Sequence, residues 1–179
     1  MELMVETLRI EAEQGHAEAQ YRLGRLYAKG QDVPQSCTEA ARWYQMAAEQ
    51  GQVSAQLRLG VMYDEGRGVL QIHSEAAYWL RLAAEQGDAN AQFLLSVMYY
   101  KGQGVPQDFV RAHMWVDLAA SRSQADARDG PTSARGLFTE QMPPDQLAEA
   151  QRLAGEWRPK TWAELKGVVR TLPRSQNGC

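Results

Sequence analysis

The residues able to carry acid–base or metal chemistry are few, and they stand apart in the sequence. The histidines are His16, His73 and His113, and they occupy different positions of the repeating pattern described below. None belongs to an HExxH run or stands beside paired carboxylates, the arrangements typical of a zinc site or of a general acid and base. We therefore expect surface or loop histidines, with no metal, no cofactor and no enzymatic activity.

The cysteines and the glycine pairs give equally little chemistry. Cys37 and Cys179 lie far apart without partners at metal-ligand spacing, so no disulfide framework is expected and a reducing compartment fits. Cys37 stands near the start of an expected helix, where a thiolate is favoured, but a half-buried packing cysteine is the preferred interpretation. The G-x-G pairs at 66–68 and 102–104 follow no strand, which opposes a nucleotide-binding loop.

Bulk composition narrows the class of protein. The chain has 179 residues, of which 23% are charged and 44% hydrophobic, with a formal net charge of -3. That balance is ordinary for a folded protein and opposes general nucleic-acid binding, which needs a basic face. No apolar run approaches the roughly 20 residues that cross a bilayer, and the acidic start "MELMVETLRIEAEQG" is unlike a secretory signal. A cytoplasmic location is expected.

One short motif recurs and reveals the organisation of the chain. "AAEQG" is written at 47–51 and again at 83–87, and "EAEQG" stands at 11–15. The motif glycines are separated by 51−15 = 36 and 87−51 = 36 residues. Further positions repeat with the same step, among them Trp43, Trp79 and Trp115. A period of this length indicates a stacked repeat array, in which the tryptophans are packing residues rather than ligand-stacking ones.

Each unit divides into two expected helices. "HAEAQYRLGRLYAKG" at 16–30 places its apolar residues three and four apart and stops at a glycine. The loop "QDVP" follows, and "QSCTEAARWYQMAAEQG" at 35–51 forms a second helix that ends at the next glycine. The "AEQG" motif recurs because each second helix must stop at the same height. Gly24 and Gly60, inside first helices, predict close approach of a neighbouring helix.

These residues carry a family resemblance. "QYRLGRLY" at 20–27 is similar to the tetratricopeptide pattern W-x2-L-G-x2-Y, with Gln20 in the tryptophan position. The unit is two residues longer, and over residues 12–121 the chain resembles the Sel1-like repeat. The resemblance implies an all-α fold, a right-handed α/α superhelix of antiparallel helix pairs with helical caps. It also implies an adaptor for other proteins, often in bacterial signalling or envelope-linked pathways.

The pattern predicts a single solenoid over residues 1–158. An N-terminal cap helix is expected at 2–14, followed by repeats at 16–51, 52–87 and 88–123. Pro131 stands where the next core leucine is due, so 124–142 forms a degenerate fourth unit, with a helix restarting at Pro131. A closing helix is expected at 144–157, and the tail 159–179 contains a short helix near 161–170. In the first loop, Asp32 replaces the glycine found at 68 and 104, and Asp tolerates left-handed geometry.

A partner-binding groove is predicted along the outward sides of the first helices. In stacks of this kind the first helices line the concave surface, and their core positions repeat while their outward positions vary. The groove runs from basic to apolar, and we expect it to bind a partner segment with acidic residues next to hydrophobic ones. Its predicted residues are Glu18, Arg22, Arg25, Lys29, Ser54, Arg58, Val61, Glu65, Asn90, Leu94, Val97 and Lys101.

Three alternatives stay open from the sequence. The apolar patch at 93–100 either forms a homodimer or is covered by the altered fourth unit. A hydrolase of cell-wall or β-lactam type is implied by cysteine-rich relatives, but those carry a cysteine pair in each repeat and this chain does not. A nucleic-acid-binding solenoid is opposed by the acidic balance. The preferred function is a protein-interaction adaptor.

Overall fold

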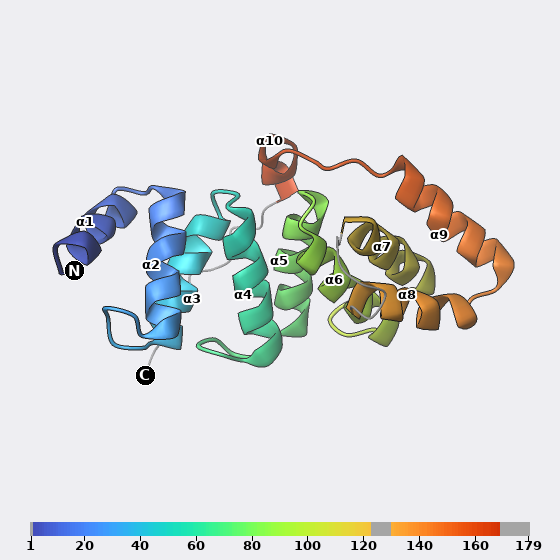
Figure 1. The fold of residues 1–179 in the computed structure, drawn as a ribbon, viewed down its shortest axis with the longest axis horizontal. Coiled ribbons are helices and arrows are strands. Elements are labelled where there is room, and N and C mark those ends of the chain that lie inside the picture. Colours follow the sequence, from blue (N-terminus) through green and yellow to red (C-terminus); the bar gives the residue numbers. More distant parts are fainter. Residues whose placement is uncertain (1, 123–129, 169–179) are drawn as a thin grey trace.

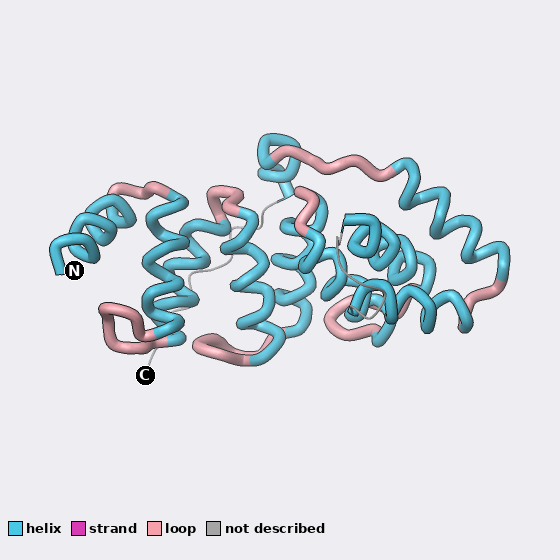
Figure 2. Tube along the Cα trace, viewed as in Figure 1, coloured by secondary structure: helices cyan, strands magenta, loops and turns pink. Residues whose placement is uncertain are grey.

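The computed structural model describes residues 2–122 and 130–168, and within them every regular element is helical (Figures 1 and 2). The all-α prediction is therefore confirmed. The helices, in chain order, are α1 (Glu2–Glu13), α2 (Ala17–Lys29), α3 (Cys37–Ala48), α4 (Val53–Glu65), α5 (His73–Glu85), α6 (Ala89–Lys101), α7 (Phe109–Arg122), α8 (Gly130–Glu140), α9 (Pro144–Glu156) and α10 (Trp162–Leu165), followed by a 3-10 turn at Lys166–Val168.

The helices form a row of hairpins along the long axis of the molecule (Figure 1). The most extensive contacts join α2 to α3, α4 to α5 and α6 to α7, so each repeat is one helix pair. Short loops make the two helices of a pair antiparallel neighbours. Successive pairs then stack through α3 against α4 and α5 against α6, and α1 covers α2 at the first end. Each unit thus supplies apolar cover for the next.

Glycine residues in the left-handed conformation end the first helices at one level. Gly30, Gly66 and Gly102 have φ of 66°, 68° and 67°, and each donates its backbone N–H to a carbonyl of the last turn. A left-handed residue at this position satisfies carbonyls that the helix leaves unpaired, and glycine adopts it without a Cβ clash. The repeated glycines of the sequence therefore mark true helix ends.

The cores between helices are built from small and large residues at repeated positions. Leu23, Leu59 and Leu95 are all 0% exposed. Inside the first helices, a Cβ on Gly24 would lie 2.8 Å from the Tyr44 ring, and one on Gly60 would lie 2.8 Å from a Leu80 carbon. The predicted close approach at these two glycines is confirmed, and it is made by side chains of the second helix of the same pair.

Asp32 adopts the left-handed conformation that its position in the loop requires. Its φ is 59°, beside 75° at Gly68 and 71° at Gly104, and it is the one non-glycine residue with positive φ in the described part of the chain. At the two glycines a Cβ would overlap the carbonyl group at the start of the preceding second helix, that of Cys37 or His73. Glycine is thus needed there for space as well as for φ.

Buried glutamines join consecutive elements. Gln20, Gln56 and Gln92 are at most 1% exposed. Each Nε2 donates to a carbonyl near the end of the preceding helix, at 3.0 to 3.1 Å, and the acceptors are those of Ala12, Ala48 and Ala84. Because a buried amide is stable only when it is hydrogen-bonded, this bond fixes where each first helix begins relative to its predecessor.

The motif glutamines complete this network. Gln50 donates to the Oε1 of Gln20 at 2.7 Å, and Gln86 donates to that of Gln56 at 2.8 Å. By the 36-residue step, the same role for Gln92 falls to Arg122, whose guanidinium lies over the Trp157 ring instead, 4.6 Å from its centroid. The Oε1 of Gln92 is consequently buried without a partner among the described residues.

After the third helix pair, α8 and α9 both pack on α7 and cover the end of the array. Pro131 lies in the first turn of α8, where its missing N–H costs no hydrogen bond. The Phe138 ring of α8 stacks on Tyr100 at 4.4 Å between centroids, and Gly130 abuts Phe93. The fourth unit therefore covers much of the 93–100 patch, and this removes much of the surface on which the homodimer prediction depends.

The chain then turns back along the array as an extended segment ending in α10, which we call the strap (residues 157–165; Figure 1). The Lys160 N–H donates to the Glu85 carbonyl at 2.8 Å, and the Trp157 indole donates to the Glu85 carboxylate at 3.3 Å. Trp162 packs over Gly51, and Leu165 is only 5% exposed. The α-helix at this place, Trp162–Leu165, is shorter than the predicted helix 161–170, because a 3-10 turn follows Leu165. Residues 169 and 170 of the predicted helix lie outside the described part of the chain.

Candidate functional site

The predicted groove residues share one helical side of α2, α4 and α6 by their spacing, and we call this side the first-helix face. Most are exposed, whereas Val61, Leu94 and Val97 are half-buried, as is Ser54. The apolar end of the predicted groove is therefore less open than its basic end. The exposed residues are Glu18, Arg22, Arg25, Lys29, Arg58, Glu65, Asn90 and Lys101.

A first hollow, of about 490 Å³, lies between α1 and α2. It contains the predicted residues Arg22 and Arg25, and Leu8 and Leu26 supply apolar surface. Two carboxylates, those of Glu11 and Asp32, also line it. The positive charge of the arginines is consequently offset within this hollow.

A second hollow, of about 440 Å³, lies one repeat further along and spans α2, α3 and α4; we call it the basic hollow. It brings together four residues of the predicted groove, Arg25, Lys29, Arg58 and Val61. Arg67, from the loop after α4, adds a further cation, and none of the described aspartates or glutamates lines this hollow. Its remaining lining residues are Tyr21, Ala28, Cys37, Tyr44 and Met62.

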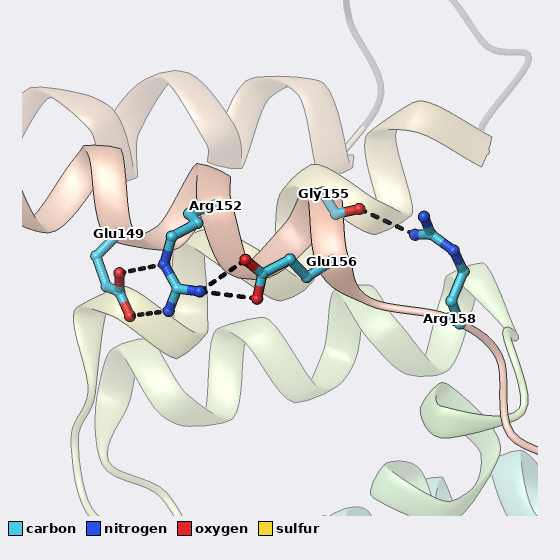
Figure 3. Close-up of polar contacts among 5 residues, drawn as sticks. All are labelled: Glu149, Arg152, Gly155, Glu156 and Arg158. Carbon is cyan, nitrogen blue, oxygen red and sulfur yellow. Dashed lines mark hydrogen bonds and ion pairs between the residues drawn. The ribbon is translucent and has the colours of Figure 1, made fainter.

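Three cations of the basic hollow have no carboxylate partner in the part of the chain that the structure describes. Arg25, Lys29 and Arg58 form no ion pair with any residue in 2–122 or 130–168, and Arg25 lies 5.8 Å from the Tyr21 ring centroid. Arg67 pairs with Glu65 at 2.6 Å. Arg152 differs from them: Figure 3 shows its guanidinium between the carboxylates of Glu149 and Glu156, with both nearest N–O distances 2.7 Å.

Tyr44 supplies an uncharged donor to the same hollow. The residue is only 3% exposed, its ring packs against Gly24 of α2, and the Tyr21 ring lies 5.8 Å away. Its hydroxyl forms no hydrogen bond with the described residues. Burial, together with Tyr21, raises the pKa of Tyr44 to about 12, although Arg58 and Arg25 oppose the shift. The phenol therefore stays protonated near neutral pH and can donate.

The sequence did not reveal the role of Tyr44. Its position belongs to the core stripe of the second helix, and the equivalent residues of the next repeats are Leu80 and Val116. A polar group at an otherwise apolar position of the period is the signal that could have identified it. The arginines, in contrast, were found from their outward positions on the first helices.

At the next repeat the equivalent space has a different content. His73 and Asp64 lie in the positions of Cys37 and Ala28, and their side chains meet at 2.9 Å. Gln103, in the position of Arg67, lies 3.1 Å from the same His73 ring nitrogen. Since Leu94 occupies the position of Arg58, the clustering of unpaired cations is confined to the first two repeats.

The expectation of surface or loop histidines is wrong for His113. This residue lies within α7 and is 1% exposed. Its Nε2 is 2.9 Å from the Thr139 hydroxyl of α8, and its Nδ1 is 3.2 Å from the Asp117 carboxylate, which also pairs with Arg135 at 2.6 Å. His113 therefore fastens α8 to α7. The period could not show this, because α8 departs from the repeat that it replaces.

Features for other chemistry are scarce in the described ranges. Residues 2–122 and 130–168 contain no group of three or more His, Cys, Asp or Glu side chains placed to hold a metal ion. His16 precedes α2, His73 begins α5 and His113 lies within α7. In these ranges no helix has both the length and the apolar character needed to span a membrane.

Comparison with solved structures finds the same architecture. A Sel1 repeat protein from Oxalobacter formigenes is 36% identical, with a TM-score of 0.65, over 73% of this chain and 96% of that one. The protective antigen c5321 of uropathogenic Escherichia coli, which displays an SLR fold, is 28% identical with a TM-score of 0.63; the match covers 97% of this chain and 45% of that one. The α/α superhelix of the prediction is confirmed.

Comparison with curated proteins gave no match. The family model for the Sel1 repeat matches three consecutive segments, residues 17–52, 53–88 and 89–123. These segments coincide with the α2–α3, α4–α5 and α6–α7 pairs. The chain therefore belongs to the Sel1 repeat family.

Proposed function

We propose that this protein is an adaptor that holds a segment of a partner polypeptide on its first-helix face. Sel1 repeat proteins generally serve as scaffolds for protein interactions. The observation that carries the proposal is the group of arginines Arg22, Arg25 and Arg58, which are exposed and lack carboxylate partners among the described residues. Exposed like charges that the protein does not pair internally favour a partner of opposite charge.

The partner segment is acidic, with hydrophobic residues beside its carboxylates. A guanidinium binds a carboxylate through two parallel hydrogen bonds, which gives both energy and orientation. Leu26 and Met62 line the two hollows next to these arginines and provide apolar contact for neighbouring side chains of the partner. The free thiol of Cys37 fits a reducing compartment, so we place the adaptor in the cytoplasm.

Affinity capture with matched variants tests this function. The purified protein, immobilised, is used to capture partners from the native cell extract, which are identified by mass spectrometry and then made as purified chains. The combined variant Arg22→Ala, Arg25→Ala and Arg58→Ala should bind such a partner at least about tenfold more weakly, since charge-assisted hydrogen bonds are lost. Its melting temperature should change by no more than about 4 °C, because exposed substitutions are nearly neutral for stability.

The control is Arg81→Ala, which removes an exposed arginine of α5 that lines neither hollow. This variant should bind the partner like the wild type. A captured partner that the triple variant binds as tightly as the wild type does would show that the first-helix arginines are not its binding site.

A further inference from the structure

We propose that the basic hollow between the first two repeats receives a phosphate group carried by a side chain of the partner segment. This inference rests on the proposed function, because it names the group that the partner places between α2 and α4. The proposed function requires only an acidic partner segment, whereas this inference requires a partner group that carries about two negative charges at one point. The residues assigned to it are Arg25, Lys29, Arg58, Arg67 and Tyr44.

The charge of the hollow exceeds what one carboxylate can balance. Its lining includes Arg25, Lys29, Arg58 and Arg67, and no acidic residue from the described ranges 2–122 and 130–168. Only Arg67 has a carboxylate partner among the described residues, and that partner, Glu65, lies outside the lining. A phosphate monoester carries a charge of about −1.5 to −2 and three acceptor oxygens. It can therefore accept from several of these groups at once, whereas a carboxylate brings one charge and two oxygens.

Tyr44 gives the hollow a hydrogen-bond donor, which favours a ligand with oxygen acceptors. Its side chain is nearly fully buried, yet its hydroxyl has no protein partner in the described residues. The surrounding lysine and arginine groups are donors only and cannot accept its proton. The hydroxyl faces the open hollow while the ring behind it is buried, so a ligand there can accept its proton. An oxygen-rich anion therefore complements Tyr44 and the cations together.

The neighbouring hollows lack this combination. The first hollow holds arginines but also the carboxylates of Glu11 and Asp32, and the space at the next repeat is occupied by the paired His73 and Asp64. The volume of about 440 Å³ and the walls formed by Tyr21, Val61 and Met62 leave room for the side chain that bears the phosphate. The site is thus specific to one step of the array.

The test uses immobilised full-length protein and degenerate nonapeptide pools that differ only at a fixed central residue. That residue is phosphotyrosine, phosphoserine, tyrosine, serine or glutamate, and retention is measured with and without competing inorganic phosphate. At least one phosphorylated pool should be retained about tenfold more than its unphosphorylated and glutamate counterparts. Tyr44→Phe, which keeps the ring and removes only the hydroxyl, should reduce this retention about tenfold, as loss of a hydrogen bond to a charged group does. Arg58→Ala should do so at least equally, and Arg81→Ala should not.

Other outcomes overturn the inference in recognisable ways. If the glutamate pool is retained as strongly as the phosphorylated pools, the hollow binds any acidic side chain and has no preference for phosphate. That result leaves the proposed adaptor function intact. Inorganic phosphate that binds while no phosphorylated pool is retained identifies a site for free anions and not for a partner. Retention unaffected by both Tyr44→Phe and Arg58→Ala places the phosphate elsewhere. Failure of the proposed function itself is recognised separately, by a captured partner that ignores the triple arginine variant.

Discussion

At the scale of single residues, the recurring glutamines have a use that the helix-end interpretation missed. The sequence predicts that "AEQG" recurs because each second helix must stop at one height. In the structure Gln50 and Gln86 also donate across the repeat to the buried Gln20 and Gln56. These buried glutamines stand where a tetratricopeptide unit carries tryptophan. A hydrogen-bonded amide pair thus connects helices at a site that related repeats fill with an aromatic ring.

Two equivalent glutamines allow this network to be measured. Gln56→Met removes the bonds to Ala48 and Gln86, whereas Gln92→Met removes one bond, to Ala84, and an oxygen that is buried without a partner. Gln56→Met should therefore lower the free energy of unfolding by about 1 kcal/mol more than Gln92→Met does, the net worth of one hydrogen bond. Urea denaturation of the two variants measures the difference. Equal losses would mean that the contact between Gln86 and Gln56 contributes nothing.

Some residues could be placed from the sequence and others could not, for a physical reason. Outward positions such as Arg22 and Arg58 follow from the helical period, because exposure depends only on the stack of identical units. Tyr44 and His113 depend on what lies opposite them: Gly24 in one case and the non-repeating α8 in the other. The repeat period predicts only the contacts that all units share, so a contact that occurs once in the structure cannot be predicted from it.

At the scale of elements, the strap packs against a turn that ends a second helix. A Cβ on Gly51 would overlap the Trp162 ring, while one on Gly15 would meet nothing within 4 Å. The two glycines have nearly the same backbone, with φ of 90° and 94°. In what a Cβ would meet, they differ by the Trp162 ring of α10. The strap itself could not be predicted from the period, because residues 157–165 have no counterpart in the repeats.

This pair isolates the energy of the strap contact. Gly15→Ala and Gly51→Ala introduce the same strain at positive φ, about 1 kcal/mol, but only Gly51→Ala also displaces the Trp162 ring. Gly51→Ala should therefore lower the free energy of unfolding by about 1–3 kcal/mol more than Gly15→Ala, the usual cost of overpacking. In a Trp162→Ala background the two substitutions should cost the same. A difference that persists there would assign the effect of Gly51 to something other than α10. Chemical denaturation of the four variants and of Trp162→Ala measures these values.

At the scale of the whole molecule, the strap connects parts of the chain that the stack keeps apart. In a solenoid each unit contacts only its neighbours, so an end can open without disturbing the rest. Here Leu165 packs in the same apolar cluster as Ala40, Tyr44 and Trp79, while α9, which leads into the strap, packs on α7. The first repeats are thereby tied to the closing helices.

Removing this tie should loosen one end of the array selectively. The double variant Trp162→Ala and Leu165→Ala takes away the two large side chains that α10 places on the junction of the first two repeats. Amide hydrogen exchange should show that the opening free energy of α3 falls by about 2 kcal/mol, a typical loss for truncating buried side chains. Amides of α7 should keep their protection. An equal loss in α3 and α7 would mean that the strap stabilises the fold as a whole.

The loop geometry decides which unit could be copied to lengthen this protein. Gly68 and Gly104 each lie against the carbonyl that opens the preceding second helix, with no space for a Cβ, whereas the first unit carries Asp32 at that place. A duplicate of residues 53–88 brings its own glycine and can be spliced in as a new internal segment. A duplicate of 17–52 would push a carboxylate-bearing side chain into its neighbour's backbone. Growth by gene duplication is thus open to the second unit and closed to the first, unless Asp32 becomes glycine.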